Sequence, residues 1–469
     1  MKAVVGVLEG VSQPYLQAEV QRLRTSGERL RMDGDLTGLP VSNSSRTYPH
    51  VAYGYMDNEI RLGYQAGVVS LISPTYGRVW LSATHHAGDT VSSTQAEGLV
   101  LEAERRLEQR PKRRTDLLRN RIEDLEPHLQ QIQERLETQQ KAVQCAQQRL
   151  EETRCQIQEQ HIRVDDLEKH YQARQRKERP TSQLAIARQR SQGLARRLKR
   201  RETAQLSADQ RLAKTQAQWQ DEQAERLSLQ ERLQRFEQDN ATNLEPVEAE
   251  FRLDAGFGSY QNVALLAEMG YEIYTKSPSQ PLTDSLKRQV ETLTPYTRVG
   301  ANAEMVAWPK RSLTRCPYPL DVALERFYTG ATLKHSTLLH YGSDPVTQDL
   351  PVWFNHYNGR QIIEAGIKEG KQVFYLHKIK VRSEPAIYLQ ECCVLFAANF
   401  IRWASLWLAE QAQPGKHALD VRKLGIKRQV QVAAHVSALV IRNSEGRLLR
   451  FSSHSAFAGK VLQLPGGHP

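Results

Sequence analysis

The stretch FRLDAGFGSYQNVALLAEMGYEIYTK, residues 251–276, decides the fold. It begins with a strand-like run that ends in a glycine turn, continues with apolar residues at helical spacing up to Gly270, and closes with the strand-like run YEIYTK. A strand, a short helix and a second strand in this order predict two parallel strands of an α/β sheet. Asp254 ends the first strand, at the edge of the sheet where sites in α/β folds usually lie.

A second aspartate occupies a similar position earlier in the chain. Residues 1–30 predict a short helical lead, and the region up to residue 100 contains the strand-like runs RLRMDGDLTGLPV, EIRLGYQAGVVSLIS and RVWLSAT. Asp35 lies near the end of the first run. Because carboxylates at the carboxyl ends of neighbouring strands meet at one sheet edge, we expect Asp35 and Asp254 to lie close together. Either aspartate taken alone is more often a turn or cap residue.

The middle of the chain has a different composition. Residues 101–246 are almost without glycine and rich in Gln, Arg, Glu, Leu and Lys, with apolar residues three or four positions apart. This spacing predicts two coiled-coil seams, and Pro180 between them stops the first helix. We therefore predict a long antiparallel α-helical coiled-coil hairpin with arms of roughly 80–95 Å, at 1.5 Å per residue. A single long helix that continues into a partner chain is the alternative.

Charge and cysteine content limit the class of protein. Among 469 residues, 64 Lys and Arg exceed 53 Asp and Glu, a net charge of +11 that favours a polyanionic partner, nucleic acid before membrane. A soluble basic protein without such a partner is the alternative. The most apolar long run, AIYLQECCVLFAANFIRWASLWL, carries Glu391 and Arg402 and predicts a buried helix, not a membrane span. With no secretory signal pattern and no metal-like cysteine spacing, we expect a cytoplasmic protein with reduced thiols.

The segment YNGRQIIEAGIKEGK, residues 357–371, places four polar side chains on one predicted helix face. A helix that advances about 100° per residue aligns Tyr357, Arg360, Glu364 and Lys371 in a narrow stripe. Such a stripe is also what a solvated helix face looks like. If the helix packs beside the sheet edge, Glu364 adds a third carboxylate to the two aspartates. An all-oxygen cluster of this kind suits Mg²⁺ or Mn²⁺, and two such ions support phosphodiester chemistry.

Taken together, DGDLTG, residues 252–276 and residues 357–371 resemble the three catalytic segments of bacterial DDE transposases of the insertion-sequence class with the YREK signature. That signature is Tyr, two residues, Arg, three residues, Glu, six residues and Lys, and this chain meets it without a gap. The resemblance covers roughly residues 30–100 and 247–410. It does not cover the helical segment between them.

The resemblance implies a fold and a set of site residues. The fold would be an RNase H-like mixed-sheet core in two parts, residues 31–100 and 247–410, the second with a β-rich insert, followed by a C-terminal extension over residues 411–469. The implied catalytic residues are Asp35, Asp254 and Glu364, which would also bind two Mg²⁺ or Mn²⁺ ions. The implied DNA-binding residues are Tyr357, Arg360 and Lys371. Asp33 competes with Asp35, but Asp35-Leu36-Thr37 fits the first segment better.

The same resemblance implies an activity. The chain would be a DNA transposase that cleaves insertion-sequence ends and joins them to target DNA by phosphodiester hydrolysis and transesterification, as a homodimer in the active complex. Two departures leave alternatives open: the long insertion precedes Asp254, where the family more commonly has it later, and only about 30 residues precede the first predicted strand. The alternatives are a catalytically impaired or domesticated DNA-binding derivative, and a structural coiled-coil protein.

Overall fold

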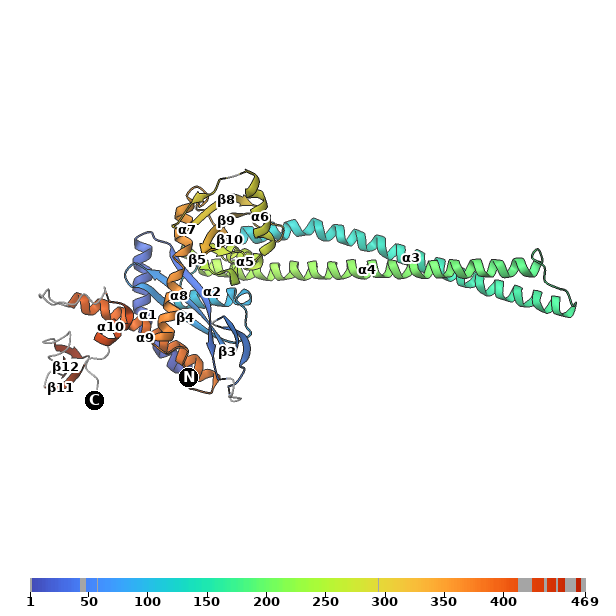
Figure 1. Cartoon of the computed structure of the whole chain (residues 1–469). Helices are drawn as coiled ribbons and strands as arrows, with labels where there is room; N and C mark the ends of the chain where they lie inside the picture. The colour runs from blue at the N-terminus through green and yellow to red at the C-terminus, as the bar shows by residue number, and fades with distance from the viewer. Residues whose placement is uncertain are drawn as a thin grey trace. The chain divides into compact units, whose positions relative to one another are not determined.

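The computed structural model describes residues 2–42, 48–56, 58–293, 295–411, 424–433, 437–443, 446–451 and 461–464. The chain divides into two compact units, one made of Met1–Arg114 with Asn240–Pro469 and the other of Thr115–Asp239 (Figure 1). We call the first the sheet unit and the second the helix pair. The helix pair is shorter than the segment 101–246 predicted as helical hairpin, because residues on both sides of it fold with the sheet unit.

A mixed sheet organises the sheet unit. Its strands are β1 (Leu30–Pro40), β2 (Ala52–Met56), β3 (Glu59–Ser73), β4 (Gly77–Ala87), β5 (Ala249–Leu253), β6 (Glu272–Lys276), β7 (Thr297–Arg298), β8 (Ala303–Arg311), β9 (Leu320–Thr329) and β10 (Thr332–Tyr341). They lie in the order β2-β3-β1-β5-β6-β10-β9-β8-β7, and β4 pairs with β3. The two strands predicted to be parallel are confirmed, since β5 runs parallel to both β1 and β6. All other pairings in this sheet are antiparallel.

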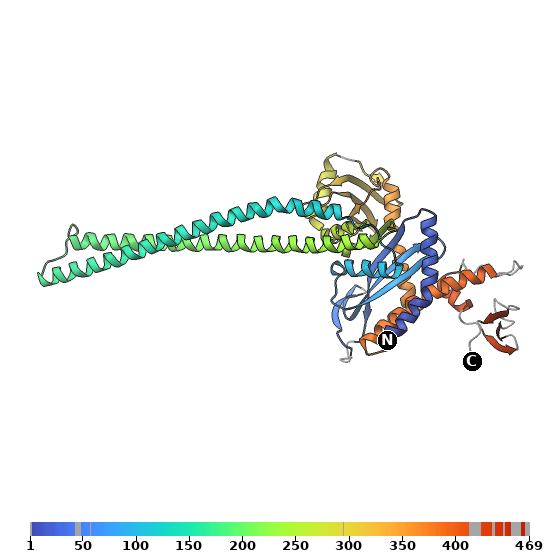
Figure 2. The same ribbon diagram turned by 180° about the vertical axis from the view of Figure 1, so that it is seen from behind.

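Helices cover the sheet. Those of the sheet unit are α1 (Lys2–Thr25), α2 (Ala96–Leu107), α5 (Tyr260–Glu268), α6 (Gln280–Leu293), α7 (Leu350–Asn358), α8 (Gln361–Gln372), α9 (Glu384–Gln411) and α10 (Ile426–Ala433). The lead helix α1 continues through Pro14 and ends at Thr25, just before Gly27, which adopts a φ of 71°. α1 and α9 lie side by side in both views, with Tyr15 stacked on Trp403 at 4.7 Å (Figure 2).

One hydrophobic cluster fixes α8 against the sheet. Buried side chains of β3, β4, α8 and α9 form it: Val68, Trp80, Ala83, Ile363, Leu395 and Ala398. Ile363 on α8 is fully buried, and burying such a side chain stabilises a fold by about 1.5–3 kcal/mol. Since Glu364 is the next residue, this cluster also sets the position of the predicted third carboxylate.

The helix pair consists of α3 (Thr115–Ala173) and α4 (Gln183–Thr242), which pack together. Cross-helix contacts show that they run in opposite directions: Arg119 pairs with Glu237 at 2.6 Å, and the Gln160 amide donates to the Ala187 carbonyl at 2.9 Å. Pro180 lies in the connection between the helices, as predicted. Two buried polar residues of α3 have partners. The Gln160 side-chain amide donates to α4, and the Thr153 hydroxyl donates to the Arg149 carbonyl of its own helix.

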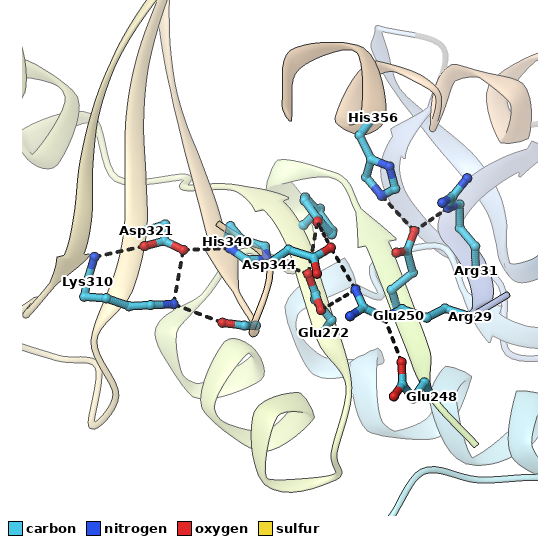
Figure 3. A network of polar contacts seen from close by, with 12 residues as sticks. Arg29, Arg31, Glu248, Glu250, Glu272, Lys310, Asp321, His340, Asp344 and His356 are labelled. Carbon is cyan, nitrogen blue, oxygen red and sulfur yellow. Dashed lines mark hydrogen bonds and ion pairs between the residues drawn. The ribbon is translucent and has the colours of Figure 1, made fainter. Parts of the chain in front are cut away.

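A polar network lies at the amino ends of the parallel strands (Figure 3). Arg29, just before β1, pairs with Glu272 and Asp344 at 2.8 Å each and with Glu248 at 3.2 Å. The ring of buried His340 lies between Glu272 and Asp321, at 2.9 Å from each. The network therefore joins β10 and β9 of the insert to the start of β1, β5 and β6. It lies at the opposite ends of these strands from Asp35 and Asp254.

The C-terminal extension is described only in part. β11 (Ala438–Asn443), β12 (Gly446–Phe451) and β13 (Val461–Leu464) form a separate antiparallel sheet. β11 and β12 form an antiparallel hairpin around the sequence RNSEG, of which residues 444–445 lie outside the described residues. No helix within the described ranges has the length and apolarity that crossing a membrane requires. No disulfide links the five cysteines.

Candidate active site

The parallel pairing of β1 with β5 brings the two predicted aspartates together. The last paired residues of the two strands are Gly34 and Leu253, so Asp35 and Asp254 follow at adjacent positions. Asp35 is not near the end of its strand, as was predicted, because β1 continues to Pro40 alongside β3. It does lie where the pairing with β5 ends. There Asp254 leaves the sheet, accepts a hydrogen bond from the Gly256 amide at 2.9 Å, and caps a short 3₁₀ turn.

The competing aspartate, Asp33, is fully engaged elsewhere. It is completely buried, and the guanidinium of Arg252 donates to both of its carboxylate oxygens, at 2.7 and 2.9 Å. The two residues are direct register partners on β1 and β5. Asp35 is different: one oxygen accepts the Leu36 amide at 2.8 Å, and the other faces Arg360. Of the two, Asp35 is thus the aspartate with ligand capacity at the sheet edge.

Arg360 bridges two of the predicted catalytic carboxylates. Its Nη1 lies 3.3 Å from Asp35 Oδ2, and its Nη2 donates to Glu364 Oε1. Burial raises the pKa of Asp35 to about 7, and the neighbouring charges of Asp254 and Glu364 act in the same direction, while Arg360 opposes them. Burial also raises the pKa of Asp254. The three carboxylates therefore form one electrostatic cluster with Arg360 as its cation.

Tyr357 and Arg360 do not share a continuous helix with Glu364, so the prediction of one helical stripe is wrong. α7 ends at Asn358, and α8 starts at Gln361 after a tight turn. The cause is Arg252, whose Nη1 donates to the His356 carbonyl at 2.7 Å and so takes up a carbonyl near the end of α7. Gly359 permits this approach, because a Cβ there would lie 2.6 Å from the same nitrogen.

Tyr357 packs against the end of β5. Its side chain is only 5% exposed, its hydroxyl donates to the Leu253 carbonyl at 3.3 Å, and burial raises its pKa. Lys276, at the end of β6, lies over its ring at 5.4 Å. Tyr357 thus fixes the residue that precedes Asp254. Its contact with DNA stays a prediction.

Arg78 anchors α8 through a glycine. Its guanidinium donates to the Ile362 carbonyl and pairs with Glu369 at 2.9 Å, and the side chain is almost fully buried. A Cβ on Gly366 would lie 2.1 Å from the centre of that guanidinium. This packing compensates for the low helix propensity of glycine. α8 therefore runs to Gln372 and includes Lys371.

Sequence reasoning missed Arg252, Arg78 and Lys276. A signal for Arg252 was present: it is a charged residue inside an apolar strand, two positions before Asp254 and hence on the same face. Arg78 starts a buried strand in the same way. An inward charge in a buried strand requires a buried partner, and in both cases the partner holds part of the site in place.

The donor set fits a hard divalent cation in its chemistry. Asp35, Asp254 and Glu364 offer only carboxylate oxygens, the ligands that Mg²⁺ and Mn²⁺ take. Burial is the main cause of the raised pKa of Asp35, and the negative charges of Asp254 and Glu364 raise it further, a repulsion that a cation would relieve. The three carboxylates are nevertheless not arranged as a metal-binding site in this structure. Across the residues that the structure describes, no three His, Cys, Asp or Glu side chains form a group able to hold a metal ion.

Comparison of the chain with protein-family models and with curated proteins gives no match.

Proposed function

We propose that this chain is a DNA transposase of the DDE class, with Asp35, Asp254 and Glu364 as its catalytic carboxylates and an RNase H-like core. The observation that supports the proposal most is the gathering of these three residues into one charged cluster. They come from β1, the end of β5 and α8, and the long helix pair separates the first from the other two. A mixed sheet with one aspartate on β1 and another at the end of the neighbouring strand is what such a core requires.

The residues divide the work of the reaction among them. Asp35, Asp254 and Glu364 would hold two Mg²⁺ or Mn²⁺ ions, which when bound make a water or a 3′-hydroxyl nucleophilic and stabilise the leaving oxygen. Tyr357 holds the strand end that carries Asp254. Arg360 and Lys371 would hold phosphates of the DNA backbone beside the reacting one. In cleavage, water breaks a phosphodiester and leaves a 3′-hydroxyl and a 5′-phosphate. In strand transfer, that 3′-hydroxyl attacks a phosphodiester of the target DNA, which forms the new phosphodiester and releases a 3′-hydroxyl of the target strand.

The helix pair and the net charge of +11 enter the same proposal. We propose that α3 and α4 form a coiled-coil hairpin that pairs two protomers or lies along flanking DNA. The segment LARRLKRR, residues 194–201 of α4, places exposed arginines on its surface. The partners would then be transposon-end DNA, target DNA and a second copy of the chain, in the cytoplasm.

One observation favours a second candidate, a catalytically impaired derivative that only binds DNA. Arg360 already pairs with both Asp35 and Glu364, and no ready-made metal-binding group is present among the described residues. The third candidate, a structural coiled-coil protein, gives no reason for three carboxylates to gather at one sheet edge.

Metal-dependent cleavage of DNA that flanks the coding sequence tests the proposal. Asp35→Asn, Asp254→Asn and Glu364→Gln each keep the size of the side chain and remove its charge, so each should abolish cleavage while DNA binding persists. Asp349→Asn is the matched control, because Asp349 caps α7 and asparagine caps a helix equally well. Binding without any cleavage by the wild type would favour the impaired derivative. Cleavage by a triad variant would remove that residue from the triad.

A further inference from the structure

The guanidinium of Arg360 lies among the three carboxylates of the candidate site. It lies between Asp35 and Glu364, is 11% exposed, and contacts both carboxylates at once. Its charge also acts on Asp254. A single cation thus interacts with all three members of the carboxylate cluster. It does so from the residue that immediately precedes α8, four positions before Glu364.

A divalent ion and this guanidinium compete for the same oxygens. Asp35 Oδ1 is taken by a backbone amide and Oδ2 by Arg360, so a metal that used Oδ2 would displace the arginine. Glu364 Oε1 is in the same situation. A monovalent cation and a divalent one held by the same carboxylates would also repel each other at short range. The two states of the cluster are therefore alternatives.

We propose that Arg360 is a latch: in the free protein it takes the place of the divalent cation, and a DNA backbone phosphate draws it away and so opens the carboxylates to metal. The inference rests on the proposed function, in which the carboxylates bind metal and the substrate is DNA. Arginine suits the exchange, because its planar guanidinium grips a phosphate with two parallel hydrogen bonds as readily as it grips a carboxylate.

The latch has a thermodynamic consequence. If DNA removes Arg360 from the carboxylates, DNA tightens metal binding, and by reciprocity metal tightens DNA binding by the same factor. The protein alone would hold metal weakly. The carboxylates would then bind the catalytic metal ions only when DNA is bound.

Binding of Mn²⁺ to the full chain, followed by the electron paramagnetic resonance signal of the free ion, tests the latch without any reaction. Arg360→Ala should bind Mn²⁺ on the order of tenfold more tightly than the wild type, since it removes a cation that contacts two ligands. Lys368→Ala is the matched control. Lys368 is an exposed cation one turn beyond Glu364 on α8, so its loss reports the general effect of charge. Adding Asp254→Asn to Arg360→Ala should cancel the gain and so locate the ion.

A second arm adds duplex DNA that flanks the coding sequence. The duplex should tighten Mn²⁺ binding to the wild type and leave Arg360→Ala unchanged. Equal Mn²⁺ affinities for Arg360→Ala and Lys368→Ala would overturn the latch. The outcome is separable from the proposed function. A tenfold gain in a protein that never cleaves DNA keeps the latch and removes the transposase, whereas cleavage with no gain removes the latch alone. Thermal unfolding of each variant checks that the fold is intact.

Discussion

Arg252 donates two hydrogen bonds to Asp33 across β1 and β5 and a third to the carbonyl of His356 on α7. One buried guanidinium thus ties together the two strands that position Asp35 and Asp254 and the helix that precedes Arg360. The first prediction concerns how much this buried pair contributes to stability.

Arg252→Met should destabilise the sheet unit by about 3–5 kcal/mol, because it leaves the Asp33 carboxylate buried without its partner. Asp33→Leu combined with Arg252→Met should cost less than Arg252→Met alone, since no charge is then left unpaired. Urea unfolding of four proteins, namely the wild type, Arg252→Met, Asp33→Leu and the double variant, gives the comparison. Two single losses that simply add in the double variant would contradict a direct pair.

The two glycines of α8 should respond to alanine in opposite ways. Gly370→Ala should stabilise the protein by up to about 1 kcal/mol, because its Cβ would meet Leu376 at an ordinary 3.6 Å and alanine favours helix. Gly366→Ala should destabilise by about 1–3 kcal/mol, because its Cβ would displace the buried Arg78 guanidinium. Thermal or urea unfolding measures both. Equal changes would mean that Arg78 moves aside freely.

His340 should make stability depend on pH. Its carboxylate partners Asp321 and Glu272 raise its pKa above the ordinary value, although burial acts in the opposite direction. A raised pKa stabilises the folded state fully below about pH 6.5, and this contribution is lost as the pH rises through the folded pKa. Each unit of the shift is worth about 1.4 kcal/mol.

The comparison is between wild type and His340→Gln, by urea unfolding from pH 6 to pH 9. The wild type should lose stability across this window, the variant should lose less, and the gap between them should be widest at pH 6. Parallel curves would show that the imidazole stays neutral at every pH tested.

Salt dependence tests the cations of the signature. Arg360→Ala should weaken binding to flanking duplex DNA and reduce the slope of log affinity against log salt by roughly 0.9, the value for one phosphate contact. Arg360→Lys should restore the slope and only part of the affinity, because lysine cannot form the double hydrogen bond. Lys371→Ala should give the smaller loss, and Lys368→Ala serves as the exposed control on the same helix. If the binding curves of the wild type and the variants superimpose at every salt concentration, Arg360 and Lys371 do not contact DNA phosphates.

Whether the protein folds without the helix pair should depend on whether the deletion keeps Arg113 and Asn240. The Arg113 backbone amide donates to the Asn240 side-chain oxygen at 2.8 Å, and the Asn240 side-chain amide donates back to the Arg113 carbonyl at 3.0 Å. Arg113 also pairs with Glu104 at 2.6 Å. Replacing residues 115–239 by a short Gly-Ser linker should leave a folded, soluble protein that fails to bring two DNA ends together. Removing residues 112–240 should unfold it, as circular dichroism would show.

Local patterns in the sequence predicted what depends on local physics. The parallel strands around α5, the two long helices and the adjacency of Asp35 and Asp254 follow from hydrophobic spacing and the usual topology of α/β sheets. The turn between α7 and α8 was missed because its cause, Arg252, is distant in the chain. The same holds for Gly366, which looks like a weak point of a helix until Arg78 is placed beside it. Such features arise from contacts between distant segments, and no single window of sequence contains both partners.

The two hydrogen bonds between Arg113 and Asn240, at the base of the helix pair, also bear on the order of folding. β1 and β5 are neighbours in the sheet, yet the whole helix pair lies between them along the chain. Each doubling of a loop costs only about 0.6 kcal/mol in closure entropy, but long loops slow the search for the partner strand. Helices form from local contacts within about a microsecond. α3 and α4, once zipped together, would deliver both chain ends to the same place and turn a remote pairing into a short one. The insertion would then act as a guide for the assembly of the site that it interrupts.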